Sequence, residues 1–159
     1  MTDASQRPDG GYVPAQGRLL IVDDEQDILD ILARALGAAG YVIDTAPNGF
    51  AALQALAVHE YDLILSNIRM PVMGGEEFYR QLCRLHARLS RCIVFCTGDI
   101  ANLATQRFLS STGAPVIFKP FLLRTVLEVV ASKLARERAS TGCSTMPMRA
   151  QDTAVAPAF

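Results

Sequence analysis

The stretch that decides the fold of this chain is LILSN at residues 63–67, which runs into the loop MPVMGG at residues 70–75. Its apolar start has the length of a strand and is typical of a strand buried on both faces of a parallel sheet. The run closes in the polar residue Asn67, and the proline and glycines that follow keep the loop out of a helix. In open α/β sheets, functional groups lie just beyond the carboxyl ends of the strands. Asn67 therefore stands where chemistry is expected.

Similar apolar runs occur on both sides of this stretch. They predict four more strands, at residues 18–22, 41–46, 92–96 and 116–118. Helical spacing of apolar residues predicts five helices, at residues 26–39, 50–58, 76–89, 100–109 and 123–139. Strands and helices that alternate in this way require right-handed crossovers. The sequence therefore predicts the α/β class, with a doubly wound, five-stranded parallel sheet covered on both faces.

The alternating pattern occupies residues 18–138, and 159 residues suit one domain of ordinary size. Residues 1–17 contain too many prolines and glycines to hold regular structure, which predicts a disordered leader. Residues 139–159 are small, polar and rich in alanine, which predicts a disordered tail. No second apolar core follows the last predicted helix, so we expect no output domain.

The charge balance argues against two classes of partner. The chain has 15 Lys and Arg against 16 Asp and Glu, a net charge of −1, and no block of like charge. Neither nucleic acid nor an anionic membrane surface is therefore an expected partner. No apolar run reaches the length of a membrane span, and the first residues lack the pattern of a secretory signal. We expect a cytoplasmic protein.

Polar side chains close four of the predicted strands. Asp23 and Asp24 follow the first strand, Asn67 ends the third, Thr97 follows the fourth and Lys119 follows the fifth. Because the carboxyl ends of parallel strands meet at one edge, these side chains are expected to converge. Carboxylates and backbone carbonyls suit Mg²⁺, whereas a hydroxyl and an ammonium suit phosphoryl oxygens. Separate capping and neutralising roles would explain each residue alone, but a shared site explains them together.

Four motifs in this sequence resemble the receiver domain of bacterial response regulators. They are LIVDDE at residues 20–25, DLILSNIRMP at 62–71, TG at 97–98 and KPF at 119–121. The resemblance covers residues 18–138 and implies a flavodoxin-like (βα)5 fold with strand order 2-1-3-4-5. It also implies a signalling module of two-component systems rather than an enzyme, in which a histidine kinase passes a phosphoryl group to an aspartate.

The resemblance further implies roles for the residues at the strand ends. Asp24 and the backbone carbonyl of Arg69 would be ligands of Mg²⁺, with Asp23 supporting the ion through water. Asn67 stands at the fourth ligand position, which is also that of the phosphoacceptor aspartate.

Contacts to the phosphoryl oxygens are implied for Thr97 and Lys119, and the Lys119–Pro120 bond is expected to be cis. Two further positions depart from the family pattern. Gly74 stands where aspartate is common, and Val116 stands where an aromatic residue is usual.

An asparagine in place of the aspartate changes the expected chemistry. A neutral amide is a poor nucleophile, so we expect Asn67 not to be phosphorylated. The lost negative charge should also weaken Mg²⁺ binding. Ser66 is not a substitute acceptor, because alternation along the strand sends its side chain to the opposite face. Two origins remain open: a natural receiver that works without phosphorylation, or an ordinary receiver whose aspartate was replaced.

The expected activity is protein–protein interaction. The partners implied by the resemblance are a histidine kinase or a phosphotransfer protein, and a homodimer through the last two helices is a further expectation. The alternative is a flavodoxin-like cofactor-binding protein or enzyme, which would need a Ser/Thr/Gly-rich loop after the first strand to hold phosphate. The acidic residues at 23–25 would repel a phosphate there.

Overall fold

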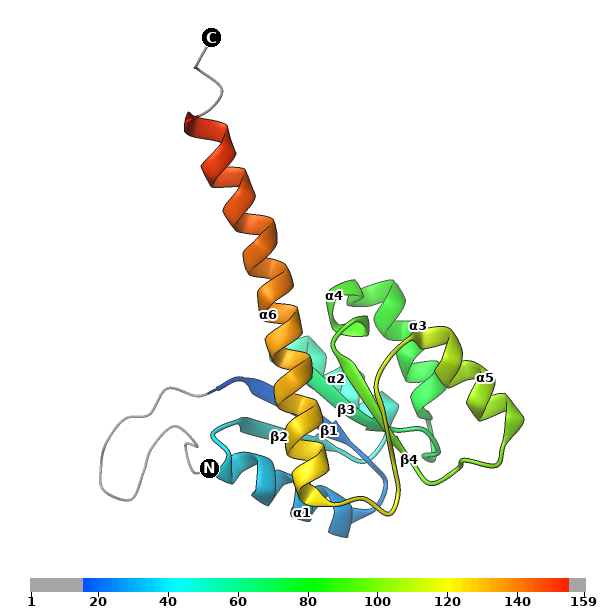
Figure 1. Cartoon of the computed structure of the whole chain (residues 1–159). Helices are drawn as coiled ribbons and strands as arrows, with labels where there is room; N and C mark the ends of the chain where they lie inside the picture. Colours follow the sequence, from blue (N-terminus) through cyan, green and yellow to red (C-terminus); the bar gives the residue numbers. More distant parts are fainter. Residues whose placement is uncertain (1–15, 155–159) are drawn as a thin grey trace, which may run out of the picture.

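A computed structural model describes the backbone of residues 16–154 and the side chains of residues 16–141. Residues 1–15 of the predicted leader, which was placed at residues 1–17, and the last five residues, 155–159, lie outside the described part. Within it, strands and helices alternate (Figure 1). The strands are β1 Arg18–Val22, β2 Val42–Ala46, β3 Leu63–Asn67, β4 Ile93–Thr97 and β5 Val116–Phe118. The helices are α1 Gln26–Ala38, α2 Gly49–Val58, α3 Gly75–Leu85, α4 Ala87–Ser90, α5 Leu103–Thr112 and α6 Leu123–Ala154.

The five strands form one parallel sheet in the order β2-β1-β3-β4-β5. This confirms the predicted doubly wound, flavodoxin-like arrangement. The register places Asn67 beside Cys96, and Thr97 beside Phe118. The ends of β3, β4 and β5 are therefore level, which brings their following residues to one edge of the sheet.

Both faces of the sheet are buried, as its continuous apolar strands require. Leu20 and Val22 of β1 belong to a core that also contains buried residues of α2, α3, α4 and α5. Leu19 and Ile21 belong to the opposite core, which is covered by α1 and α6 (Figure 1). Alternate residues of one strand thus serve two separate cores.

The predicted third helix is divided in two. Its pattern indicates one helix over residues 76–89, but α3 ends at Leu85 and α4 begins at Ala87. His86 between them leaves the helical region, with φ −141° and ψ 63°. Beyond the break, the Arg88 guanidinium donates a hydrogen bond of 2.5 Å to the backbone oxygen of Tyr61. A contact between segments so far apart in the sequence does not affect the spacing of apolar residues. The sequence pattern alone therefore does not reveal the break.

The fourth predicted helix is displaced toward the C-terminus. It was expected over residues 100–109, and α5 spans Leu103–Thr112. The Asn102 side chain accepts hydrogen bonds from the backbone nitrogens of Ala104 and Thr105, which fixes the start of the helix. Gly113 ends it in the left-handed region, with φ 68°. Asn102 and Gly113 thus indicate the two ends of α5 more accurately than the spacing of its apolar residues does.

The last helix is longer than predicted. The pattern indicates an end near Ala139, whereas α6 continues to Ala154 and its last turns project away from the sheet (Figure 1). The prediction of a disordered tail from residue 139 therefore differs from the structure as far as Ala154. A helix already formed needs no new nucleus to elongate, so Ala, Met, Arg and Gln can extend it despite Gly142 and Pro147.

The loop after β3 is shaped by a close approach and a strained residue. The backbone nitrogen of Gly75 donates to the oxygen of Ile68 at 2.7 Å, and a Cβ at position 75 would collide with the backbone oxygen of Asn67. Val72 in the same loop has φ 69°, the one positive φ of a non-glycine residue in the described chain. Gly75 thus allows α3 to begin directly against the end of β3.

Candidate functional site

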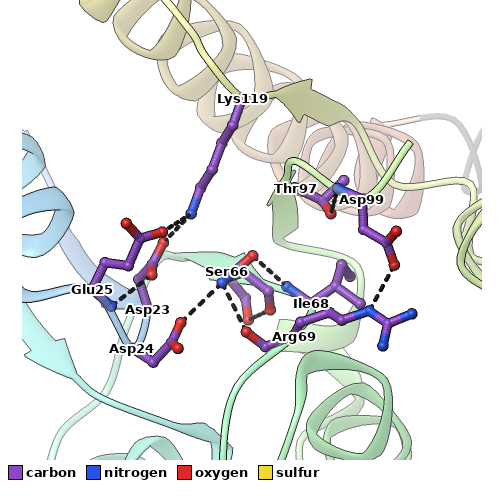
Figure 2. Close-up of polar contacts among 10 residues, drawn as sticks. Asp23, Asp24, Glu25, Ser66, Ile68, Arg69, Thr97, Asp99 and Lys119 are labelled. Atoms are coloured by element: carbon purple, nitrogen blue, oxygen red, sulfur yellow. Dashed lines mark hydrogen bonds and ion pairs between the residues drawn. The ribbon is translucent and has the colours of Figure 1, made fainter. Parts of the chain in front are cut away.

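The predicted site residues meet at the carboxyl edge of the sheet. Figure 2 shows Asp23 and Glu25 facing Lys119, Asp24 beside them but directed away from the lysine, and Thr97 on another strand end. All of the predicted site residues except Asp23 line an open cavity of about 500 Å³. Its lining residues are Asp24, Glu25, Asn67, Arg69, Thr97, Gly98, Asp99 and Lys119. The convergence that parallel strands predict is therefore present in the folded chain.

Lys119 is held by carboxylates on the β1 side of the cavity. Its Nζ donates to Asp23 Oδ2 at 2.7 Å and lies 3.5 Å from Glu25 Oε1 (Figure 2). Asp23 is only 2% exposed, and its Oδ1 accepts from the backbone nitrogen of Glu25 at 3.0 Å. Burial by itself would lower the pKa of Lys119, but the hydrogen bond and charge of Asp23, together with Glu25, outweigh it and raise the pKa. The lysine is therefore a firmly protonated cation.

Asn67 bridges the two sides of the cavity through its carboxamide. Its Nδ2 donates to Asp24 Oδ1 at 3.2 Å and to the backbone oxygen of Arg69 at 3.0 Å. Its Oδ1 accepts from the backbone nitrogen of Ile68 at 2.9 Å. Ser66 is fully buried, and its hydroxyl donates to the backbone oxygen of Asn67 at 2.9 Å. The amide oxygen and nitrogen of Asn67 thus both have partners, and Ser66 does not line the cavity.

Thr97 contributes to the wall of the cavity and orders the loop after β4. It is 1% exposed, and its Oγ1 accepts from the backbone nitrogen of Asp99 at 3.0 Å. The Asp99 carboxylate accepts from Arg69 Nε at 2.6 Å and from Thr105 Oγ1 at 3.0 Å. The hydrogen bond from Arg69, strengthened by that from Thr105 and by the charge of Arg69, outweighs burial and lowers the pKa of Asp99.

Several of these residues were not predicted as part of the site. The side chains of Glu25, Asp99 and Thr105 and the guanidinium of Arg69 join the network, although only the carbonyl of Arg69 was expected there. Asp99 carries a signal that could have revealed it, because it is an acidic residue just after a strand, like Asp23 and Asp24. Thr105 carries none, since it lies inside α5.

The four predicted magnesium ligands do not fit a cation as they are arranged. Both oxygens of Asp23 accept hydrogen bonds, and Asn67 presents a nitrogen donor, not an oxygen, toward Asp24 and Arg69. Among the described residues, no group of three or more His, Cys, Asp or Glu could hold a metal ion. The donors that Mg²⁺ requires are oxygens, preferably with two or more charges.

Comparison with known proteins places these features in a family. The profile of the "Response regulator receiver domain" matches residues 19–131. The response regulator receiver protein CpdR of Brucella abortus is 32% identical over 117 residues, which are 74% of this chain and 96% of CpdR. The transcriptional regulator NtrC of Escherichia coli is 38% identical over 85 residues, 54% of this chain but only 18% of NtrC. The chain thus spans almost all of one relative and a small part of another.

Solved structures agree with the sequence comparison. A CheY-like receiver domain from Methanospirillum hungatei is 30% identical, with a TM-score of 0.71 over 77% of this chain and 97% of its own. The chemotaxis response regulator CheY4 of Vibrio cholerae is 29% identical, with a TM-score of 0.65 over 73% and 97%. With the family profile spanning the sheet and the site residues alike, the chain belongs to the response regulator receiver domain family.

Proposed function

We propose that this chain is a receiver module of a two-component phosphorelay that takes up no phosphoryl group and acts by protein–protein interaction. In this proposal Asn67 stands at the phosphoacceptor position, at the end of the third strand of the receiver sheet. The observation that carries it is the hydrogen bonding of Asn67, whose amide nitrogen donates to Asp24 and to the Arg69 carbonyl.

The chemistry of an amide explains the lack of phosphorylation. A carboxylate attacks phosphorus because it is anionic, and its acyl phosphate can be stabilised by a cation and a lysine. The Asn67 oxygen is neutral and already accepts a hydrogen bond from the Ile68 backbone. Thr97 and Lys119 keep the places proposed for contacts to phosphoryl oxygens, but Lys119 is paired with Asp23.

Receiver domains interact with histidine kinases or phosphotransfer proteins, and we propose such a partner for this chain. A homodimer through α5 and α6 is a second proposed contact, supported by the exposed apolar side chains of Leu103 and Leu123 on these helices. We propose a cytoplasmic location. Among the described residues, no helix has the length and apolarity needed to cross a membrane.

We propose that this site binds Mg²⁺ more weakly than a receiver with three carboxylates, because Asn67 carries no negative charge. The flavodoxin-like alternative gains no support. The turn after β1 presents Asp24 and Glu25 to the cavity, where a cofactor phosphate would need hydrogen-bond donors.

Incubation with acetyl phosphate and MgCl₂, followed by mass spectrometry, tests the proposal. We expect no acid-labile phosphate on the unaltered chain and one phosphate, located at residue 67, on Asn67→Asp. Asn48→Asp is the matched control, because it adds the same charge at the cap of α2 and should take up no phosphate. Phosphate mapped to any aspartate of the unaltered chain would overturn the proposal.

A binding assay tests the second half of the proposal. Purified histidine kinases and phosphotransfer proteins from the same organism are titrated with the unaltered chain and measured by calorimetry. We expect at least one to bind, with an affinity that does not change when acetyl phosphate is added. Binding that appears only after acetyl phosphate treatment contradicts a function independent of phosphorylation.

A further inference from the structure

We infer that the Asn67 carboxamide is an internal substitute for a bound cation, so that the conformation of the cavity is independent of divalent metal. This inference rests on the proposed function, since it concerns the same site. It goes further than a weakened magnesium site. In this inference the amide itself binds the oxygens of Asp24 and Arg69 that a cation would otherwise bind.

The first support is the pair of acceptors on one nitrogen. Asn67 Nδ2 is within hydrogen-bond distance of a carboxylate oxygen of Asp24 and of the Arg69 backbone oxygen. These oxygens come from the turn after β1 and the loop after β3. Both oxygens are acceptors and cannot satisfy each other, so a donor or a cation must lie between them. The two protons of the amide supply that donor, one for each oxygen.

The second support is that the amide can adopt only one orientation. Its Oδ1 faces the backbone nitrogen of Ile68 at 2.9 Å. Reversing the amide would turn its NH₂ group toward another donor and its oxygen toward two acceptors. Such a reversal loses all three hydrogen bonds in a side chain that is only 8% exposed. The donor is therefore directed at Asp24 and Arg69 by the backbone itself.

The third support is the engagement of the remaining carboxylate. Asp23 Oδ2 is bound by Lys119, and Oδ1 by the Glu25 backbone nitrogen. A metal ion would have to displace the half-buried ammonium of Lys119 and an amide donor before it gained these oxygens. Hydrogen bonds thus satisfy both oxygens of Asp23 without an ion.

An aspartate at position 67 would reverse this balance. Its two oxygens have no protons to donate, so the contacts to Asp24 and Arg69 would become repulsive at neutral pH. The aspartate would also join Asp23 and Asp24 to make three carboxylates around one cavity. A cation relieves the repulsion within such a set, and ligand linkage then predicts that the cation stabilises the fold.

Thermal unfolding with EDTA or with millimolar MgCl₂ tests the inference. We expect the melting temperature of the unaltered chain to be the same in both buffers. Asn67→Asp should melt several degrees lower than the unaltered chain in EDTA and should recover on addition of MgCl₂. The control Asn48→Asp should respond to neither. A rise in the melting temperature of the unaltered chain with MgCl₂, equal to that of Asn67→Asp, overturns the inference.

A measurement on the unaltered chain keeps the test valid even if Asn67→Asp does not fold. In ¹⁵N-labelled protein, the side-chain amide signals of Asn67 should show slow solvent exchange, unlike those of an exposed asparagine. They and the backbone signals of Asp24 and Arg69 should not shift during titration with MgCl₂. Saturable shifts of these signals would contradict the inference.

The two proposals fail separately. Acetyl phosphate labelling of the unaltered chain overturns the proposed function, whatever the effect of MgCl₂ on melting. A magnesium-dependent melting temperature without phosphate uptake overturns only the inference about the Asn67 amide.

Discussion

Arg69 Nε lies 2.6 Å from Asp99 Oδ2, and this ion pair joins the loop after β3 to the loop after β4 across the mouth of the cavity (Figure 2). Asp99 also accepts from Thr105 of α5. The pair therefore connects the residue whose carbonyl meets Asn67 to Thr105 in the first turn of α5.

Replacing Arg69 with Gln should raise the pKa of Asp99. The hydrogen bond from Arg69 is the main reason that this pKa is lowered in the folded chain. A lowered pKa means that the ionised carboxylate stabilises the fold above the ordinary value of about 3.9, and this stabilisation is lost as the pH falls through the lower, folded value. Carboxyl ¹³C NMR titration measures the shift. Arg34→Gln, on the exposed face of α1, is the control and should leave the pKa of Asp99 unchanged.

Replacing Lys119 with Met should destabilise the fold, because it leaves the buried Asp23 without its cation. We expect a loss of about 1 to 3 kcal/mol at neutral pH in urea unfolding, between the values for exposed and buried pairs. The control is Lys133→Met, which removes an ion pair within α6 to Glu137 and should cost no more than about 0.5 kcal/mol. Equal losses in the two variants contradict a special role for Lys119.

The same pair predicts a dependence on alkaline pH. The folded pKa of Lys119 is raised above its unfolded value of about 10.4, so protonated Lys119 contributes its full stabilisation below that pH. The contribution is lost as the pH rises through the folded value. The difference in unfolding free energy between the unaltered chain and Lys119→Met should therefore be constant from neutral pH to about pH 9 and should shrink above it. A difference that stays constant as the pH rises through the folded pKa of Lys119 is inconsistent with this pairing.

Val72 predicts a stabilising substitution. A β-branched residue at φ 69° is strained, and Val72 is 82% exposed, so its side chain gains little from packing. Val72→Asn should raise the unfolding free energy by about 1 kcal/mol, since Asn tolerates the left-handed region. The control Val58→Asn, at the end of α2 and 73% exposed, should change it by less than about 0.5 kcal/mol. A loss of stability in Val72→Asn would show that the valine is not strained.

Replacement of glycine by alanine should have opposite effects on stability at Gly75 and at Gly37. Gly75→Ala should cost about 1 to 3 kcal/mol, because the added methyl collides with the backbone of Asn67 where α3 meets β3. Gly37 lies inside α1 with nothing within 4 Å of an added Cβ. Gly37→Ala should therefore stabilise by about 0.5 to 1 kcal/mol. Calorimetric melting distinguishes the two, and a neutral Gly75→Ala would contradict the close approach.

The sequence was sufficient for the parts of the fold that depend on periodicity. The apolar run at residues 63–67 gave β3 its bounds, and the alternation of strands and helices gave the class of sheet. The break at His86 was not predictable in this way, because no glycine or proline marks it and a contact between Arg88 and Tyr61 accompanies it. The end of α6 differs from the predicted end near Ala139, because the apolar spacing stops there while helix propensity still favours elongation.

The sequence predicted where the site lies, but it did not predict which hydrogen bonds its residues form. The positions of Asp23, Asn67, Thr97 and Lys119 at strand ends predicted that they converge. Their carboxylate and amide groups suggested which of them could bind a cation. Which oxygen meets which donor depends on side-chain orientation, and no spacing in the sequence shows that Asn67 directs its nitrogen at Asp24. The ion pair of Arg69 with Asp99 escaped notice for the same reason.

The polar residues that close the strands have a consequence for how the sheet assembles. A sheet that is apolar on both faces gains no alignment from alternation, since a strand displaced by one residue still presents apolar groups to each side. If β3 shifted by one residue in one direction, the polar Asn67 would lie inside the sheet between β1 and β4. A shift in the other direction would bring apolar residues to the exposed edge of the sheet. Asn67 and Thr97 thus fix the register of β3 and β4. For this purpose a neutral asparagine is as effective as an aspartate. The alignment of the strands thus requires a polar side chain at position 67 but not a charged one.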